Sequence, residues 1–161
     1  LRGENFLSRK VTKHVGNIKR DLHFCDVAEK LYEPPLQKQK YLDSWKNNKL
    51  KLGNLNSSRD WGYADDYIKA MHLILQQKTP NDYIIATGET HKAEDFVQLA
   101  FKTIGIENWR EYIEISSLFI RPSEVDYLRG DSSKAREKLG WKPKVDFAHL
   151  VRKMVAADAG F

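Results

Sequence analysis

The stretch RDWGYADDY, residues 59–67, combines side chains with which a protein readily holds a phosphorylated ligand. Arg59 offers planar, paired N–H donors that match the oxygens of a phosphate or diphosphate. Asp60 can orient that guanidinium, and Trp61 can pack the loop rigidly. The competing interpretation is structural: Trp61 belongs to the core, Arg59 pairs with Asp60 or Asp65, and the charges only introduce a helix. The residues alone leave both interpretations open.

Composition and charge narrow the class of protein. The chain has 161 residues, of which 41% are hydrophobic and 30% charged, as is typical of one folded domain or part of one. An excess of 27 Lys and Arg over 22 Asp and Glu gives a net charge of +5, which suits an anionic ligand. Because the sequence has no apolar run of membrane-spanning length and no signal-peptide core at its start, we expect a cytoplasmic protein with no membrane partner.

Several catalytic patterns are absent from the sequence. It contains neither a glycine-rich dinucleotide loop nor a Walker loop, and no nucleophile elbow. Its five histidines stand singly, so we expect no metal site. The single Cys25 cannot form an intramolecular disulfide. The sequence therefore predicts no self-contained catalytic centre.

Hydrophobic periodicity predicts alternating helices and strands and hence an α/β or α+β fold. The abrupt first helix reads like the start of a segment taken from a longer protein. The second long helix follows RDWG, with Asp65 or Asp66 as its expected N-cap. The predicted elements are a helix from residue 6 to about 18, an irregular excursion at about 19–49 with a short helix near 26–31, a strand at 50–54, a helix at about 65–77, a strand at 83–87, a helix from about 90 to 104, a strand within 111–120, a helix capped by Asp131 or Ser132 and stopped by Gly140, and a final helix carrying Phe147 to Val155.

Longer motifs carry a resemblance. The segments are RGENFLSRKVT, KLGNLNSSRDWGYADDYIKAMHLILQ, DYIIATGETHKAEDFV, RPSEVDYLRGDSSKAREKLGWKP and LVRKMVAAD. Together they resemble the GDP-mannose 4,6-dehydratase family, a group of extended short-chain dehydrogenases, over most of the chain apart from roughly residues 19–49. The last long motif alone resembles the wider group of nucleotide-sugar epimerases and dehydratases.

The resemblance implies an α/β fold, the C-terminal substrate-binding part of a Rossmann-type enzyme, over residues 1–161. The nucleotide-binding half that holds NADP in such enzymes is missing from this sequence. The family converts GDP-mannose to GDP-4-keto-6-deoxymannose, and the complete enzyme is expected to be a homo-oligomer. Its proton chemistry uses a Tyr-x-x-x-Lys pair, but no tyrosine here is followed by lysine four positions later. We therefore expect no catalytic residue in this chain and no activity from it alone.

The resemblance also implies binding residues. By position in the family motifs, GDP would be contacted by Leu7 and Lys10, its phosphates by Arg59, the nucleotide by Arg121 and Glu124, and NADP by Arg2. Leu1 stands where the family has the first of two arginines, which weakens the expected NADP contact. For three of these residues a simpler interpretation stays open, because Lys10 and Arg121 can be solvated and Glu124 can pair with Arg121 at i+3.

Three alternative functions stay open. The chain can be the substrate half of another GDP-sugar epimerase or reductase, although RDWG followed by DYIKAM is more similar to the dehydratases. It can be a basic RNA-binding module that uses Lys38 to Lys51 with Tyr41 and Trp45 as stacking platforms, and its affinity would then fall steeply with salt. We regard nucleic acid as the less favoured partner because no known motif supports it. The third alternative is a scaffold whose apolar faces await a missing half.

Overall fold

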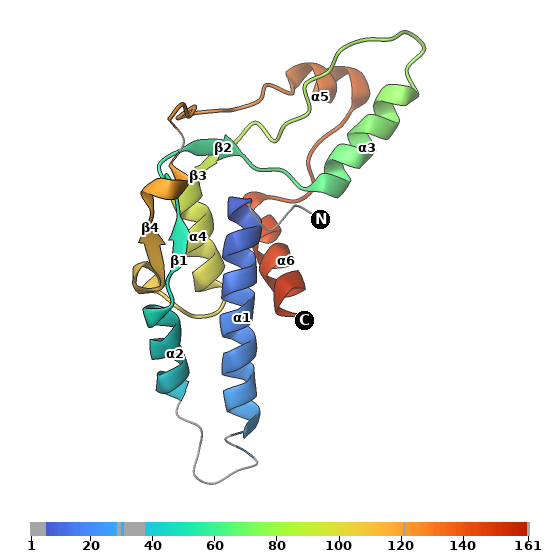
Figure 1. Ribbon diagram of the computed structural model, residues 1–161. Coiled ribbons are helices and arrows are strands. Elements are labelled where there is room, and N and C mark those ends of the chain that lie inside the picture. The colour runs from blue at the N-terminus through green and yellow to red at the C-terminus, as the bar shows by residue number, and fades with distance from the viewer. Residues whose placement is uncertain (1–5, 29, 31–37, 121, 161) are drawn as a thin grey trace.

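The computed structural model describes residues 6–28, 30, 38–120 and 122–160, and Figure 1 shows their arrangement. Helices predominate and the strands are short. The elements in chain order are α1 (Leu7–Ala28), α2 (Lys38–Asn47), β1 (Leu50–Leu52), β2 (Ser58–Asp60), α3 (Ala64–Leu75), β3 (Thr90–Lys92), α4 (Ala93–Lys102), the 3-10 helix η1 (Trp109–Tyr112), β4 (Ile113–Ile115), the 3-10 helix η2 (Ser117–Phe119), α5 (Ser133–Leu139) and α6 (Phe147–Ala159).

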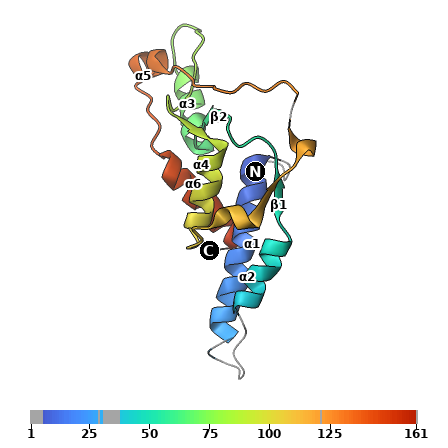
Figure 2. The same cartoon turned by 90° about the vertical axis from the view of Figure 1, so that its left-hand side faces the viewer.

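The core lies between α1, α4 and α6, which run side by side in both views (Figures 1 and 2). Each helix contributes apolar residues at three- and four-residue spacing, so that one face of each is buried. The fully buried members include Val11, Val15 and Ile18 of α1, Phe96, Val97, Ala100 and Phe101 of α4, and Val151 and Val155 of α6. The periodicity predicted from the sequence is confirmed for these three helices.

Two small sheets connect the core to the rest of the molecule. β1 pairs with β4 in parallel, with Leu50 opposite Ile113. β2 pairs with β3 in antiparallel fashion, with Arg59 opposite His91. Ser58 also bridges to Tyr127: its amide donates to the Asp126 carbonyl at 2.7 Å and its carbonyl accepts from the Leu128 amide at 3.0 Å. Residues 126–128 are thereby fixed along β2.

A second, smaller cluster lies at the other end of the molecule, where Figure 1 shows α3 beside α5. Ala70, Ala135 and Trp141 are its buried members. α5 ends at Gly140, whose φ of 63° is the left-handed conformation that glycine adopts without steric cost. Gly140 as the stop of this helix and Ser132 as its N-cap are confirmed.

The irregular excursion predicted at about 19–49 is wrong for most of its length. α1 continues to Ala28, and residues 38–47 form α2. The helix continues because Leu22, Cys25 and Ala28 extend the apolar face at three-residue steps, with Cys25 and Ala28 buried. α2 packs back on α1 through Trp45, whose Nε1 donates to Asp21 at 2.9 Å.

Other boundaries differ from the prediction. The N-cap of α3 is Tyr63 rather than Asp65 or Asp66, which lie in the first turn. The helix expected from about residue 90 begins at Ala93, because residues 90–92 pair with β2. The strand expected within 111–120 is reduced to residues 113–115 by 3-10 turns on both sides. Residues 83–87 join no ladder among the described residues, although a strand was expected there.

Among the helices of the described residues, none combines the length and the apolar character needed to cross a bilayer.

Candidate functional site

β2 places Arg59 beside Glu124. Arg59 Nη2 lies 3.4 Å from Glu124 Oε1, and Arg59 Nη1 donates to the Ser58 carbonyl at 2.8 Å. Asn54 Nδ2 donates to the other oxygen of Glu124 at 3.2 Å. The ion-pair partner of Arg59 is thus a residue 65 positions further along the chain, and neither Asp60 nor Asp65 takes that place.

The Arg59 and Glu124 side chains are 28% and 21% exposed. They are therefore partly shielded from solvent but open to a ligand. A guanidinium carries more N–H donors than the contacts with Ser58 and Glu124 use, so phosphate oxygens can be added to this pair. Arg121, the other arginine expected at the nucleotide, lies outside the described residues, and so does Arg2.

Asp60 does not orient the Arg59 guanidinium, and the expectation that it does is wrong. Its carboxylate instead accepts hydrogen bonds from the amides of Thr87 and Gly88, both at 2.9 Å. The Thr87 hydroxyl donates to it at 2.7 Å and the Gly130 amide at 3.3 Å. Asp60 therefore joins β2 to two distant backbone segments.

Trp61 packs the loop against the core, as its type predicts. Its ring stacks on Phe96 with a centroid distance of 4.9 Å, and its Nε1 donates to the His91 carbonyl at 3.0 Å. The His91 ring stacks in turn on Phe147 at 3.9 Å. The backbone that follows Arg59 is held by aromatic packing and by hydrogen bonds.

The first turns of α1 bring Leu7 and Lys10 toward the same region. Leu7 is partly buried against the core, and Lys10 Nζ lies 3.7 Å from the centroid of the Phe119 ring. Phe119 touches the backbone of Gly53 so closely that a Cβ there would lie 2.2 Å from the Phe119 carbonyl oxygen.

A continuous series of contacts therefore runs from Lys10 to Arg59. It passes through Phe119 to Gly53, then from Asn54 to Glu124, and from Glu124 to Arg59. Four of the residues expected at the nucleotide, Leu7, Lys10, Arg59 and Glu124, lie on or beside this series. The structure brings together residues that are widely separated in the sequence.

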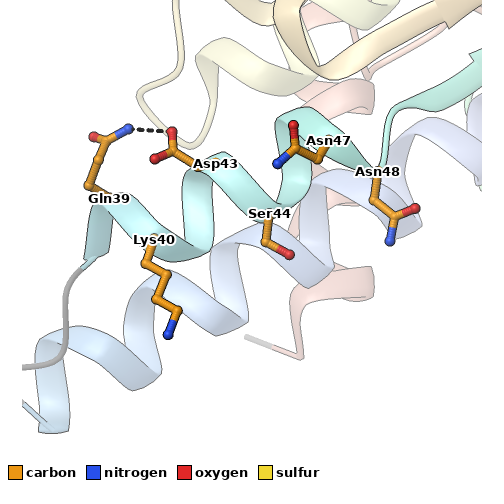
Figure 3. Close-up of a pocket in the computed structure, with 6 residues that line it drawn as sticks. All are labelled: Gln39, Lys40, Asp43, Ser44, Asn47 and Asn48. Atoms are coloured by element: carbon orange, nitrogen blue, oxygen red, sulfur yellow. Dashed lines mark hydrogen bonds between the residues drawn. The ribbon is translucent and has the colours of Figure 1, made fainter.

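A hollow of about 530 Å³ adjoins this series. Its walls combine apolar side chains, among them Trp109 and Ile113, with polar ones that include Asn54. A second hollow of about 690 Å³ lies on α2, and Figure 3 shows that its labelled side chains are all polar or charged. Ligand sites usually combine apolar walls with a few polar groups, so the hollow beside Asn54 is the better candidate.

Sequence reasoning missed Asn54 and Phe119. Both lie in segments that drew attention for other reasons, KLGNL and SSLFI. A lone asparagine after a strand is usually read as a turn residue. Its contact with Glu124 spans 70 positions, a separation that local pattern does not reach.

Comparison with solved structures establishes the fold class. The chain aligns with the protein RMD of Pseudomonas aeruginosa, solved in complex with NADPH, over 99% of its own length and 44% of that chain, with a TM-score of 0.68 and 18% sequence identity. The similarity at this identity concerns the fold. The expected α/β fold class is confirmed, and the chain shares the fold of the corresponding part of these solved structures.

Comparison of sequences then gives the family. The profile described as GDP-mannose 4,6 dehydratase matches residues 40–154. GDP-mannose 4,6 dehydratase 2 of Arabidopsis thaliana is 46% identical over 98% of this chain, and the GDP-mannose 4,6 dehydratase of Drosophila melanogaster is 40% identical over 98%. The chain belongs to the GDP-mannose 4,6-dehydratase family, and it spans 35% and 38% of the length of these two relatives.

Proposed function

We propose that this chain is the GDP-sugar-binding portion of a GDP-mannose 4,6-dehydratase, with residues 1–161 forming the substrate-binding part. The observation that carries the proposal is the half-buried Arg59 beside Glu124 in a chain of this family. Asn54, which donates to Glu124, also lines a hollow with apolar and polar walls. An arginine in such a place suits the diphosphate of a nucleotide sugar.

Each residue of the contact series has a role in this proposal. Arg59 donates to the diphosphate, and Lys10 adds a positive charge on the same side. Glu124 holds the guanidinium in place and offers oxygens to donor groups of the nucleotide. Leu7 lies on the GDP side, while Arg121 and Arg2 stay predicted contacts of the nucleotide and of NADP.

In the complete enzyme this portion would bind and orient GDP-mannose for conversion to GDP-4-keto-6-deoxymannose. NADP, when bound, supplies an acceptor and donor of hydride. Proton transfer is assigned to residues that this sequence does not contain, since no Tyr-x-x-x-Lys pair occurs in it. We expect the chain to be inactive alone, and the complete enzyme to be a cytoplasmic lyase and a homo-oligomer.

Calorimetric titration tests the binding step. The chain should bind GDP-mannose in preference to UDP-glucose, and Arg59→Ala should weaken that binding about tenfold or more, because a charged hydrogen bond to phosphate is lost. Arg152→Ala removes an exposed arginine of α6 and serves as the matched control. Equal affinity for both nucleotide sugars, or an unaffected Arg59→Ala variant, would refute the proposal.

Complementation tests the division of labour. Mixing the chain with the part of a family member that it does not match should yield the 4-keto-6-deoxy product, whereas neither part should do so separately. Product formed by this chain alone would contradict the assignment of the catalytic residues elsewhere.

The alternative RNA-binding function gains no support from the basic segment. Lys38 forms an ion pair with Asp26, and Lys46 Nζ lies 2.6 Å from Glu111 Oε2. Trp45 donates to Asp21 and makes a T-shaped contact with the His14 ring at a centroid distance of 4.8 Å, so it is engaged in packing α2 on α1. Two of the lysines and the tryptophan thus serve the packing of α2.

A further inference from the structure

We propose that Asp60 is a positioning residue for the diphosphate, acting through Arg59. Its carboxylate fixes the backbone that presents the guanidinium without touching the guanidinium itself. The inference rests on the proposed function of Arg59 and extends it to a residue that makes no contact with ligand.

The geometry of the carboxylate carries the first step. Oδ1 accepts from the amide and the hydroxyl of Thr87, at 2.9 and 2.7 Å. Oδ2 accepts from the Gly88 amide at 2.9 Å and the Gly130 amide at 3.3 Å. Only an ionised carboxylate presents acceptors alone on both oxygens, and such charge-assisted bonds are among the stronger ones in proteins.

The two segments that meet at Asp60 are shaped to do so. Gly88 has a φ of 84°, a conformation in which other residues are strained. Gly130 passes so close to Ala86 that a Cβ on it would lie 2.2 Å from the Ala86 Cβ. On the outer side, Arg136 Nη2 donates to the Thr87 carbonyl at 2.6 Å. The backbone amides are therefore held facing the carboxylate from both segments.

Arg59 lies between Ser58, whose backbone bonds to another segment, and Asp60, whose side chain does so. Ser58 is fixed by its backbone bonds to Asp126 and Leu128, and Asp60 is fixed by Thr87, Gly88 and Gly130. Segment 126–130 is thereby held to β2 at both of its ends. Glu124, the partner of Arg59, lies two residues before Asp126 and so leads into the segment that Ser58 and Asp60 hold along β2.

The substitution Asp60→Asn separates this role from simple space filling. An asparagine has the same shape, but its amide nitrogen is a donor and cannot accept the amide hydrogens that face it. Amides on one side of the loop lose their acceptor, and the strand that carries Arg59 is released. We expect GDP-mannose affinity to fall about tenfold and amide hydrogen exchange to accelerate at Thr87, Gly88 and Gly130.

A double-mutant cycle distinguishes positioning from general destabilisation. If Asp60 acts through Arg59, Asp60→Asn combined with Arg59→Ala should bind no more weakly than Arg59→Ala alone. Asp21→Asn is the matched control, because it alters a carboxylate that accepts from Trp45 far from the site and should leave affinity unchanged. Thr87→Val keeps the amide bond to Asp60 but removes the hydroxyl bond to it, together with the hydroxyl contacts with the Glu89 backbone at 3.2 Å. It gives a milder second variant with an expected loss of about threefold.

Each outcome decides the question. Unchanged affinity in both Asp60→Asn and Thr87→Val, or losses that add to that of Arg59→Ala, overturn the positioning role while GDP-mannose binding by the unsubstituted chain stands. If amide hydrogen exchange at Thr87, Gly88 and Gly130 is unchanged in Asp60→Asn, Asp60 does not fix these backbone segments and the positioning role is overturned. Absence of GDP-mannose binding by the folded, unsubstituted chain overturns the proposed function and the positioning role with it.

Discussion

At the scale of single residues, Asp66 is a buried charge that joins α3 to the loop before α6. It is 2% exposed, and its Oδ2 accepts from the amides of Lys144 and Val145 at 2.8 and 3.0 Å. Burial by itself would raise the pKa of this carboxyl, but the two amides and the nearby Lys69 outweigh burial and hold the pKa below its ordinary value. The charged form is therefore the one that the fold stabilises.

Replacing Asp66 tests this balance. Asp66→Ala should lower the free energy of unfolding by about 2 kcal/mol, because two partly buried amides lose their acceptor. Asp66→Asn should cost less, since one amide oxygen can accept both bonds. Urea unfolding measures both, with Asp65→Ala, an exposed acid of the same helical turn, as control.

The same carboxyl gives a pH dependence. The pKa of the Asp66 carboxyl is lower in the folded chain than in the unfolded chain. Its contribution to the free energy of unfolding is therefore fully present above a pH of about 4, the ordinary pKa, and is lost as the pH falls from there through the pKa of the folded chain. Equal losses in the free energy of unfolding for Asp66→Ala and Asp65→Ala would contradict the role of Asp66 as acceptor for the Lys144 and Val145 amides.

For His14 the fold stabilises the uncharged form, whereas for Asp66 it stabilises the charged form. Burial lowers the pKa of its imidazole from 6.5 to about 4, in a site between Trp45 and Phe101. The unfolded chain then binds a proton at a higher pH than the folded chain does, so stability falls as the pH drops from about 6.5 toward 4. From pH 7 to pH 5 the expected loss is about 2 kcal/mol.

Substitution of His14 should remove that part of the pH dependence. In His14→Phe the unfolding free energy should change less between pH 7 and pH 5, as urea titrations at the two values would measure. His72→Gln, at an exposed position of α3, should keep the full dependence. A pH profile of His14→Phe identical to that of the unsubstituted chain would argue against a buried neutral imidazole.

Sequence reasoning reached individual residues of the site but not their pairing. Arg59 was singled out by its chemistry and Glu124 by the family resemblance. The structure places Arg59 Nη2 at 3.4 Å from Glu124 Oε1. Asp60 was assigned to the wrong partner because adjacency in sequence favoured Arg59, whereas alternation along a strand directs neighbouring side chains to opposite faces. Such contacts depend on where β2 lies relative to residues 87–88 and 130.

At the scale of elements, Gly16 allows the backbones of α1 and α6 to approach closely where the two helices pack together. A Cβ on Gly16 would lie 2.8 Å from the Asp158 carbonyl carbon. Beside it, Asp158 accepts from Thr12 Oγ1 at 2.6 Å and forms an ion pair with Arg9. Polar contacts and close backbone approach thus occur at one point of the interface.

Gly16→Ala should therefore destabilise the chain despite the better helix propensity of alanine. Separating two packed helices costs about 1–3 kcal/mol, which exceeds the gain of about 1 kcal/mol from propensity. Thermal and urea unfolding should show a net loss. Val27→Ala, at an exposed position of the same helix, controls for propensity and should not destabilise. A Gly16→Ala chain more stable than the original would show that α6 moves away freely.

Helix boundaries show how far local pattern reaches. The prediction ended the first helix near Ile18 because the next apolar residues are Leu22, Cys25 and Ala28, of which the last two give a weak hydrophobic signal. Their spacing nevertheless continues the buried face. Residues 38–47 were harder, because this helix contains no buried residue and is positioned by its contacts with α1 and η1.

At the scale of the whole molecule, α3 carries an apolar face that the described residues do not cover. Ile68, Met71 and Leu75 are 60%, 60% and 80% exposed at helical spacing. Nearby, residues 83–87 have the composition of a strand but pair with no strand among the described residues, and Ile84 is 60% exposed. A strand needs a partner as well as a suitable sequence, which explains why the strand predicted there is wrong for this chain.

The apolar face of α3, defined by Ile68, Met71 and Leu75, should make the chain associate with itself at high concentration. Met71→Lys combined with Leu75→Lys should shift sedimentation profiles toward the monomer. Since both side chains are largely exposed, the free energy of unfolding should change by less than about 1 kcal/mol. Gln76→Lys combined with Gln77→Lys adds the same charge without removing apolar surface, so it separates the effect of charge from that of the apolar face. If that control dissociates the chain equally well, net charge rather than the apolar face governs association.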